Sequence, residues 1–147
     1  MSVEIHAEDV DLVNEVNEAF LDSWFEAVTS LEEKILGDVS VILTSDNYLL
    51  EMNKQYLDHD YFTDIITFDY TEGTIVSGDL FISLDRVKDN ASTLSVDFKD
   101  ELHRVCVHGL LHLVGYKDKS EDDEKLMRSK EDEMLKLRVF HVEHLKS

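Results

Sequence analysis

The sequence predicts an α+β fold in a single compact domain: a mixed four-stranded sheet packed around a buried central helix, with about five helices in all. Two observations lead to this prediction. Short β-branched segments alternate with longer segments whose apolar residues recur at helical spacing, and no linker or repeat interrupts them. One helical segment, residues 98–114, is apolar nearly all round, so several elements must cover it. The length of 147 residues fits one domain over residues 1–147.

The strands are predicted from short runs rich in β-branched or aromatic side chains. A Glu72-Gly73 turn separates the last two of these runs. The strands are expected at residues 3–6, 39–44, 65–68 and 79–82.

The helices are predicted from apolar residues three and four apart and from capping residues. Ser45 and Asp97 are of the type that caps a helix N-terminus, and each precedes a segment with helical spacing. The helices are expected at residues 9–30, 45–57, 84–91, 98–114 and 120–137.

The segment 108–118, His-Gly-Leu-Leu-His-Leu-Val-Gly-Tyr-Lys-Asp, predicts a metal site on the apolar helix. Four residues advance a helix by about 400°, so His108 and His112 project from one face, roughly 6 Å apart along the axis. Both imidazoles can therefore reach one ion. Gly115 is the residue type that ends a helix in a left-handed turn. Such a turn folds the chain back and brings Asp118 to the same ion as a third ligand.

Paired histidines on a helix are also common as surface residues, or as core residues bonded to the backbone. The apolar surroundings of His108 and His112 disfavour this alternative, because burying two unpaired imidazoles is unfavourable and a metal ion removes the penalty. Zinc suits a mixed set of imidazole and carboxylate ligands, so we expect one zinc ion per chain. Three protein ligands leave a coordination position open, as in catalytic zinc sites.

The helix motif resembles the signature of the YbeY family, bacterial rRNA maturation factors regarded as metal-dependent endoribonucleases. Two upstream segments are similar to further motifs of that family, in the same order. They are residues 52–68, with Met-Asn-Lys-Gln-Tyr and Thr-Asp-Ile-Ile-Thr-Phe, and residues 78–83, Gly-Asp-Leu-Phe-Ile-Ser. The resemblance implies a metal-dependent endoribonuclease that acts in rRNA maturation and ribosome quality control by hydrolysing phosphodiesters in single-stranded RNA. It also implies that rRNA or a ribosomal subunit is the partner.

Several side chains receive functional roles from the motifs and the resemblance. His108, His112 and Asp64 are expected to be catalytic, with Asp64 orienting a ligand or a water molecule. The alternative for Asp64 is a bond to nearby backbone amides at a strand entrance. Asn53 and Tyr56 are three residues apart on one helix face, and the resemblance implies that they bind substrate.

The chain departs from the family pattern at two positions that bear on the site. Asp118 stands where the family has a third histidine; it keeps the capacity to bind metal but lowers the charge of the site by one unit. Leu57 stands where the family has an arginine able to clamp a phosphate, and residues 58–62 offer no cation in its place. Gly109 occupies the position at which His-Glu-x-x-His metalloproteases carry a catalytic glutamate, which argues against a peptidase.

The net charge of −19 argues against a simple nucleic-acid binder, because neutralising phosphates requires Lys and Arg. The acidic excess is unevenly distributed: residues 1–98 carry 22 acidic and four basic residues, whereas residues 99–147 carry eleven and ten. Basic residues that follow the histidine motif are expected to contact substrate phosphates, unless this stretch is simply a solvated helix face. They are Lys117, Lys119 and Arg128, with Lys125 and Lys130 nearby.

A second function stays open beside the enzyme. The chain would then be a non-catalytic, metal-stabilised ribosome-assembly factor whose acidic surface docks a basic ribosomal protein. Leu57 and the net charge favour this alternative, while an open coordination position favours the enzyme. No segment is long and apolar enough to cross a membrane, and no basic-then-apolar leader is present, so we expect a soluble, cytoplasmic protein without a membrane partner.

Overall fold

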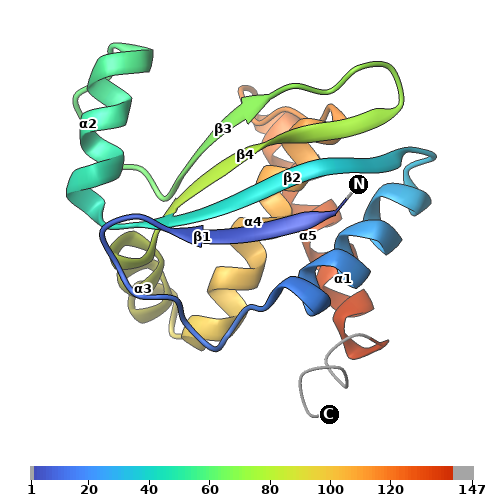
Figure 1. Ribbon diagram of the computed structural model, residues 1–147, viewed down its shortest axis with the longest axis horizontal. Helices are drawn as coiled ribbons and strands as arrows, with labels where there is room; N and C mark the ends of the chain where they lie inside the picture. Colours follow the sequence, from blue (N-terminus) through green and yellow to red (C-terminus); the bar gives the residue numbers. More distant parts are fainter. Residues whose placement is uncertain (1, 141–147) are drawn as a thin grey trace.

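Four strands form one mixed sheet in the order β1-β2-β4-β3 (Figure 1). β1 pairs parallel with β2, and β2 pairs parallel with β4, whereas the edge strand β3 is antiparallel to β4. The computed structural model describes residues 2–140; within them the strands are β1 (Val3–Ala7), β2 (Ile35–Thr44), β3 (Ile65–Asp69) and β4 (Ile75–Ser83). The predicted mixed four-stranded sheet is confirmed, and both β2 and β4 are longer than expected.

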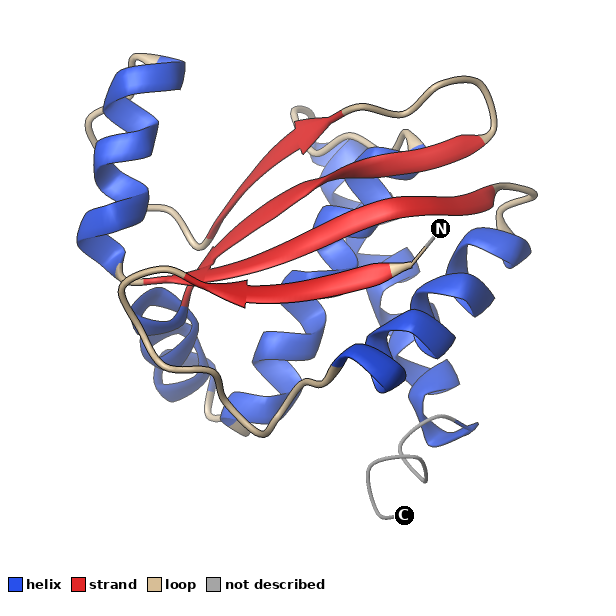
Figure 2. Cartoon of the chain, viewed as in Figure 1, coloured by secondary structure: helices blue, strands red, loops and turns tan. Residues whose placement is uncertain are grey.

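The helices lie mainly on one face of this sheet (Figure 2). α1, α3 and α4 pack against the strands, α5 packs on α4, and α2 stands at one end of the sheet. No helix in the part of the chain that the structure describes is long and apolar enough to cross a membrane. The helices are α1 (Glu18–Leu31), α2 (Asp46–Leu57), α3 (Leu84–Leu94), α4 (Phe98–Val114) and α5 (Glu121–Lys136), followed by the 3-10 turn η1 (Leu137–Phe140).

α4 is the buried central helix that the sequence predicts, and its bounds agree with the prediction. Its close approach to the sheet depends on two glycines. A Cβ atom added to Gly78 of β4 would lie 2.5 Å from the Phe68 carbonyl oxygen and 2.7 Å from Leu113 Cδ2. A Cβ atom on Gly109 of α4 would lie 2.6 Å from Ile65 Cδ1. These glycines therefore set how closely the helix that carries both histidines of the motif lies against β3 and β4.

A third histidine of α4, His103, belongs to the core. Its ring is fully buried, with its centroid 4.9 Å from that of Phe20 and 5.8 Å from that of Trp24. His103 Nε2 donates to the Glu15 carbonyl oxygen over 2.8 Å, and Nδ1 accepts from Arg138 over 2.9 Å. Burial lowers the pKa of His103 to about 4, so the ring is neutral near pH 7.

The predicted helix over residues 9–30 is wrong in its first half, because α1 begins only at Glu18. Asn17 caps it, its side chain accepting a hydrogen bond from the Phe20 amide over 2.7 Å. Upstream, the Asp9 carboxylate accepts from the amide of Ser45, the N-cap of α2. Val10, Val13 and Val16 of this loop pack on the core without forming a helix, whereas Leu12 is 63% exposed.

Gly78→Ala should destabilise the fold by about 1–3 kcal/mol, because the added methyl group meets a backbone carbonyl that no rotamer change can move. Urea unfolding followed by circular dichroism measures this. Ser40→Ala, on the neighbouring strand β2, is the control and should change the free energy of unfolding by less than about 0.5 kcal/mol. Equal midpoints for Gly78→Ala and the control would show that the close approach does not matter.

Candidate metal centre

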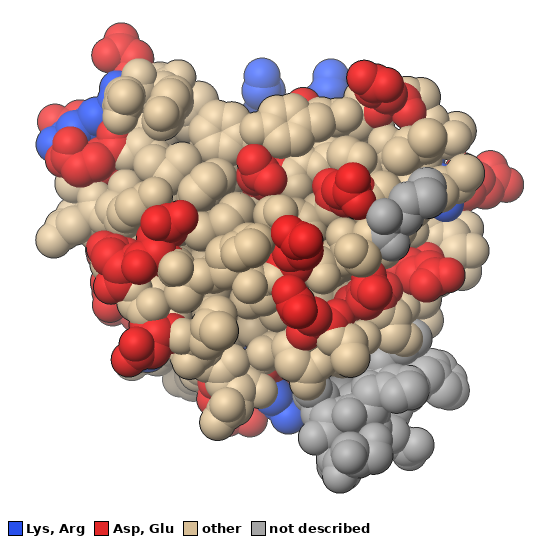
Figure 3. All heavy atoms as spheres, viewed as in Figure 1, with Lys and Arg blue, Asp and Glu red and all other residues tan. Residues whose placement is uncertain are grey.

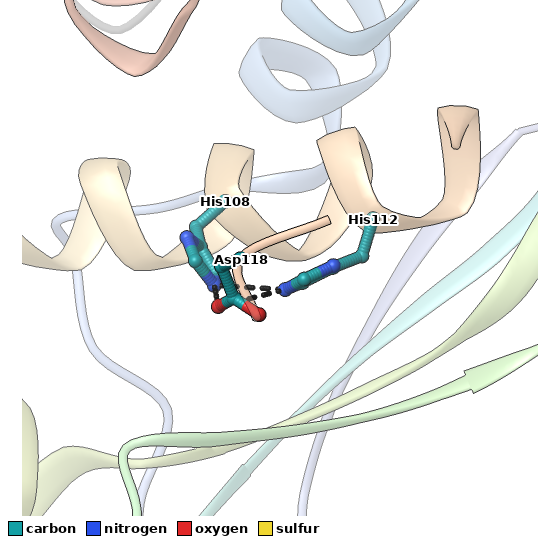
Figure 4. Close-up of side chains that lie close together, drawn as sticks. All are labelled: His108, His112 and Asp118. Atoms are coloured by element: carbon teal, nitrogen blue, oxygen red, sulfur yellow. Dashed lines mark hydrogen bonds and ion pairs between the residues drawn. The ribbon is translucent and has the colours of Figure 1, made fainter. Parts of the chain in front are cut away.

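The predicted ligands come from one helix and the loop that follows it. His108 and His112 project from α4, which ends at Gly115 with a φ of 126°, a value that side-chain-bearing residues rarely adopt. The Gly115 and Tyr116 amides both donate to the Leu111 carbonyl oxygen, which turns the chain back across the end of the helix. This turn brings Asp118 over the two imidazoles (Figure 4).

The three side chains place one donor atom each around a common point. The two Nε2 atoms lie 3.0 Å apart, and each lies 3.3 Å from Asp118 Oδ2. With metal–ligand bonds of about 2.0 Å, the edges of a zinc tetrahedron measure about 3.3 Å, so the triangle has the size that zinc requires. Among the described residues, only this group of His, Cys, Asp or Glu side chains is compact enough to share an ion.

The other nitrogen of each imidazole determines which atom is free for the ion. His108 Nδ1 lies 2.6 Å from Glu131 Oε2, and His112 Nδ1 lies 3.0 Å from the Tyr116 carbonyl oxygen. Carboxylate and carbonyl oxygens only accept, so both Nδ1 atoms carry the proton and both Nε2 atoms present lone pairs. In these neutral tautomers three acceptors face one another. A cation resolves that repulsion, so the donor set fits a metal ion.

Glu131 of α5 is the residue of this site that the sequence reasoning missed. It is 4% exposed and also accepts from Arg104 over 2.9 Å. Burial would raise the pKa of Glu131, but its hydrogen bonds from His108 and Arg104 lower it, so the carboxylate stays charged. A signal was present, because Met127, Glu131 and Met134 are spaced four and three residues apart on one buried helix stripe.

The same carboxylate controls the electrostatics of His108. Burial lowers the pKa of His108, but the hydrogen bond and charge of Glu131 outweigh it, and Asp118 and Asp64 act in the same direction. The net result is a raised pKa, which means that the surroundings favour positive charge at this position.

Two cavities meet at His108 and Asp118. The larger, of about 650 Å³, is bordered mainly by α5, and the smaller, of about 300 Å³, extends toward Asp64. Asp64 Oδ2 accepts from Asn90 over 3.3 Å, and the Asp64 carbonyl oxygen accepts from the Ser83 amide. Burial raises the pKa of Asp64, against the opposing charge of His108. Asp64 thus lies beside the donor group without belonging to it, and its catalytic role stays a prediction.

The residues predicted to bind phosphate differ in whether they line the two cavities. Arg128 lines both cavities, and its side chain is 62% exposed. Lys117 and Lys119 are exposed on either side of Asp118 but do not line the cavities. Lys130 turns away to Glu32 and Glu133, at 3.6 and 3.4 Å.

Asn53 and Tyr56 of α2 were expected to face the substrate together, but one side chain is buried and the other is exposed. Asn53 is 2% exposed, and its Nδ2 donates to the Tyr61 carbonyl oxygen over 2.9 Å, so the amide anchors the loop after α2. Tyr56 is 59% exposed and meets Phe68 edge-on, with ring centroids 6.0 Å apart. Neither residue lines the two cavities. Their role in binding substrate stays a prediction, and the burial of Asn53 disfavours direct contact.

The loop after α2 offers no free cation where the family pattern has an arginine. Leu57 is 44% exposed at the end of α2. The guanidinium of Arg86, from α3, lies over the Phe62 ring at 5.1 Å. Arg86 is already paired with Asp46 at 2.6 Å and with Asp89 at 3.1 Å. Of the cavity-lining cations on α5, Arg128 borders both cavities and Lys125 borders the larger one.

The fold and the donor group together define a class: small α+β proteins in which a buried helix and the loop after it carry a His-His-Asp group that could hold a metal ion. Residues 2–138 match a family model described as Endoribonuclease YbeY. The chain therefore belongs to the YbeY family, as the motifs suggested.

Similar proteins cover most of the chain. The Endoribonuclease YbeY of Flavobacterium johnsoniae is 53% identical over 86% of this chain and 90% of its own length. That of Parabacteroides distasonis is 47% identical over 92% of this chain and 94% of its own. The solution structure of TM1509 from Thermotoga maritima matches with a TM-score of 0.63 and 26% identity, covering 92% of this chain and 88% of that one.

Glu131→Gln should weaken zinc binding about 10- to 100-fold, because it removes the charge that holds and polarises His108. Competitive titration with a chromophoric chelator measures the affinity. Asp132→Asn is the matched control, since Asp132 also pairs with Arg104 but does not contact His108. If both variants bound zinc as tightly as the unchanged protein, Glu131 would have no part in holding the ion.

Proposed function

We propose that this chain is a zinc-dependent endoribonuclease that cleaves single-stranded segments of rRNA during ribosome maturation in the cytoplasm. The observation that carries the proposal is the convergence of three acceptor-only atoms, from His108, His112 and Asp118, at the meeting point of two cavities. The names of the relatives support the endoribonuclease activity.

The donor group suits a catalytic rather than a structural ion. Structural zinc sites are closed by four protein ligands, whereas three ligands leave room for water and substrate. A bound zinc ion supplies Lewis-acid chemistry, polarising a phosphoryl oxygen and lowering the pKa of water. Asp118, whose side chain is 41% exposed, holds the ion at the mouth of the cavities. Asp64 lines the smaller cavity, and we propose that it orients a water molecule or the substrate.

The distribution of charge indicates where RNA would lie. Acidic side chains are scattered over the face of the molecule that shows the sheet, with few basic ones among them (Figure 3). Phosphates would be repelled there. The α5 side of the centre offers Arg128 and Lys125 in the cavity wall, beside Glu121 and Glu124, with Lys117 and Lys119 exposed on the adjoining loop. We propose that Arg128 contacts the phosphate at the metal and that the two lysines contact its neighbours.

The acidic sheet face favours a second role alongside catalysis. A basic ribosomal protein would complement that face electrostatically and bring the enzyme to the ribosomal subunit. This docking role would use the sheet face, and RNA cleavage would use the cavities beside α5, so one does not exclude the other. A purely non-catalytic assembly factor would bind metal and ribosomal subunits without cleaving RNA.

Cleavage of a labelled single-stranded rRNA fragment tests the proposal. Metal-stripped protein should be inactive and should regain activity when one equivalent of zinc is added. Asp118→Ala should lose at least about tenfold in zinc affinity together with cleavage, because two histidines alone hold zinc poorly. Asp118→His should keep the metal.

Asp122→Ala is the control, since Asp122 is an exposed carboxylate four residues further along the chain. It should behave as the unchanged protein does. Cleavage that survives metal removal would contradict the proposal. Zinc binding without any cleavage would instead establish the non-catalytic assembly factor.

A further inference from the structure

The smaller cavity extends away from the metal centre along α4. Its volume is about 300 Å³, and His108 and Asp118 form one end of it. The remaining walls come from α3, α4, α5 and the residue before β3. The polar side chains that line it are Asp64, Asn90, Glu101, Arg104, Arg128 and Glu131.

Glu101 is the unexplained group in this cavity. It is 5% exposed, and no hydrogen bond or ion pair involves its carboxylate among the described residues. Every fully sealed side-chain nitrogen or oxygen in the described part of the chain has a hydrogen-bond partner, so the free oxygens of Glu101 reach the cavity. The Glu101 carboxylate therefore receives no hydrogen bond from the described residues and is open to a donor in the cavity.

The neighbouring charged groups do not supply that donor. Arg104, one turn along α4, is held by Glu131 and Asp132, each at 2.9 Å. Asn90 donates its amide to Asp64 and leaves a carbonyl oxygen as a further acceptor. Burial raises the pKa of Glu101, and the charge of Asp64 adds to this effect while Arg104 opposes it.

Glu101 lies on the same helix face as the histidines. Residues 101, 105, 108 and 112 are spaced four, three and four apart, so their side chains share one side of α4. Seven residues separate Glu101 from His108, about 10 Å along the axis. A strand whose phosphate lies at the centre would therefore present a neighbouring nucleotide to Glu101.

We propose that this cavity is a ribose subsite and that Glu101 accepts a hydrogen bond from a 2′-hydroxyl of the RNA. The inference rests on the proposed function and deepens it, because it makes Glu101 the residue that distinguishes RNA from DNA. The 2′-hydroxyl is the hydrogen-bond donor that ribose has and the deoxyribose of DNA lacks. It can supply the donor that Glu101 lacks among the described residues. Arg128, at the rim, meets the adjoining phosphate.

A hydrated divalent cation is the competing occupant. The carboxylates of Asp64 and Glu101 would suit it, but the guanidinium groups of Arg104 and Arg128 line the same walls and would repel it. Outside the His-His-Asp group, no three ligand side chains of the described residues lie close enough together to coordinate it jointly. The ribose is favoured because its 2′-hydroxyl donates to a carboxylate while the adjoining phosphate pairs with the exposed Arg128.

The test compares binding and cleavage of an RNA oligonucleotide with those of a version that has one 2′-deoxy nucleotide beside the cleaved bond. Zinc-loaded full-length protein should prefer the RNA by roughly 10- to 100-fold, as expected for a hydrogen bond to a charged group. Glu101→Leu, of similar size, should abolish the preference while keeping affinity for the deoxy strand. Glu101→Gln, which retains an acceptor oxygen, should restore part of it.

Glu26→Leu, at an exposed position on α1, is the control and should keep the full preference. An unchanged preference in Glu101→Leu would overturn the ribose subsite while leaving the endoribonuclease in place. Loss of Mn²⁺ binding in Glu101→Leu with an unchanged preference would overturn it in favour of a cation. Failure of every variant and of the unchanged protein to bind or cleave either strand would overturn the proposed function together with the subsite.

Discussion

The convergence of three hydrogen-bond acceptors on one point is the constraint on which the rest of the site depends. His108 and His112 each give their Nδ1 proton to an acceptor-only oxygen, which leaves two bare Nε2 atoms 3.0 Å apart and facing Asp118. Such an arrangement is unfavourable without a positive charge at its centre. The arrangement of donor atoms therefore favours a cation at this point.

The surrounding fold holds that arrangement in place from both sides. Gly78 and Gly109 let α4 lie close against the sheet, so the histidines keep a fixed height above β3. On the far side, the Tyr116 hydroxyl donates to Glu32 at the end of α1, and Lys130 of α5 lies 3.6 Å from the same carboxylate. These contacts secure the loop whose Tyr116 carbonyl orients His112 and whose next residues lead to Asp118. The packing of α4 and the polar contacts of the loop thus both hold the donor atoms of His108, His112 and Asp118 in place.

The sequence predicted those parts of the molecule that local patterns determine. The helix 98–114, the turn at Gly115 and the convergence of His108, His112 and Asp118 were predictable because periodicity, the helix-ending glycine and the residue spacing all lie within some twenty residues, although Asp97 makes no side-chain capping hydrogen bond. The helix predicted from residue 9 failed because its apolar spacing was real but its polar residues serve other elements, with Asp9 holding the amide of Ser45. The spacing of apolar residues cannot show that a polar side chain bonds to a distant element.

Glu131 and Glu101 were missed for a different reason. Each is a glutamate on an otherwise apolar stripe, Glu131 between Met127 and Met134 and Glu101 in line with His108. Glutamates are common on helices, and only the tertiary packing shows that these two are buried. The contact between Lys130 and Glu32 was not predictable either, because Glu32 is about a hundred residues away in the sequence.

X-ray absorption at the zinc edge of the reconstituted protein tests the central claim most directly. The account predicts nitrogen and oxygen neighbours at about 2.0 Å, with the outer-shell scattering of two imidazoles and no sulfur. His112→Ala should lose one imidazole from that shell. A sulfur neighbour at about 2.3 Å, or an imidazole count that does not change in His112→Ala, would contradict it.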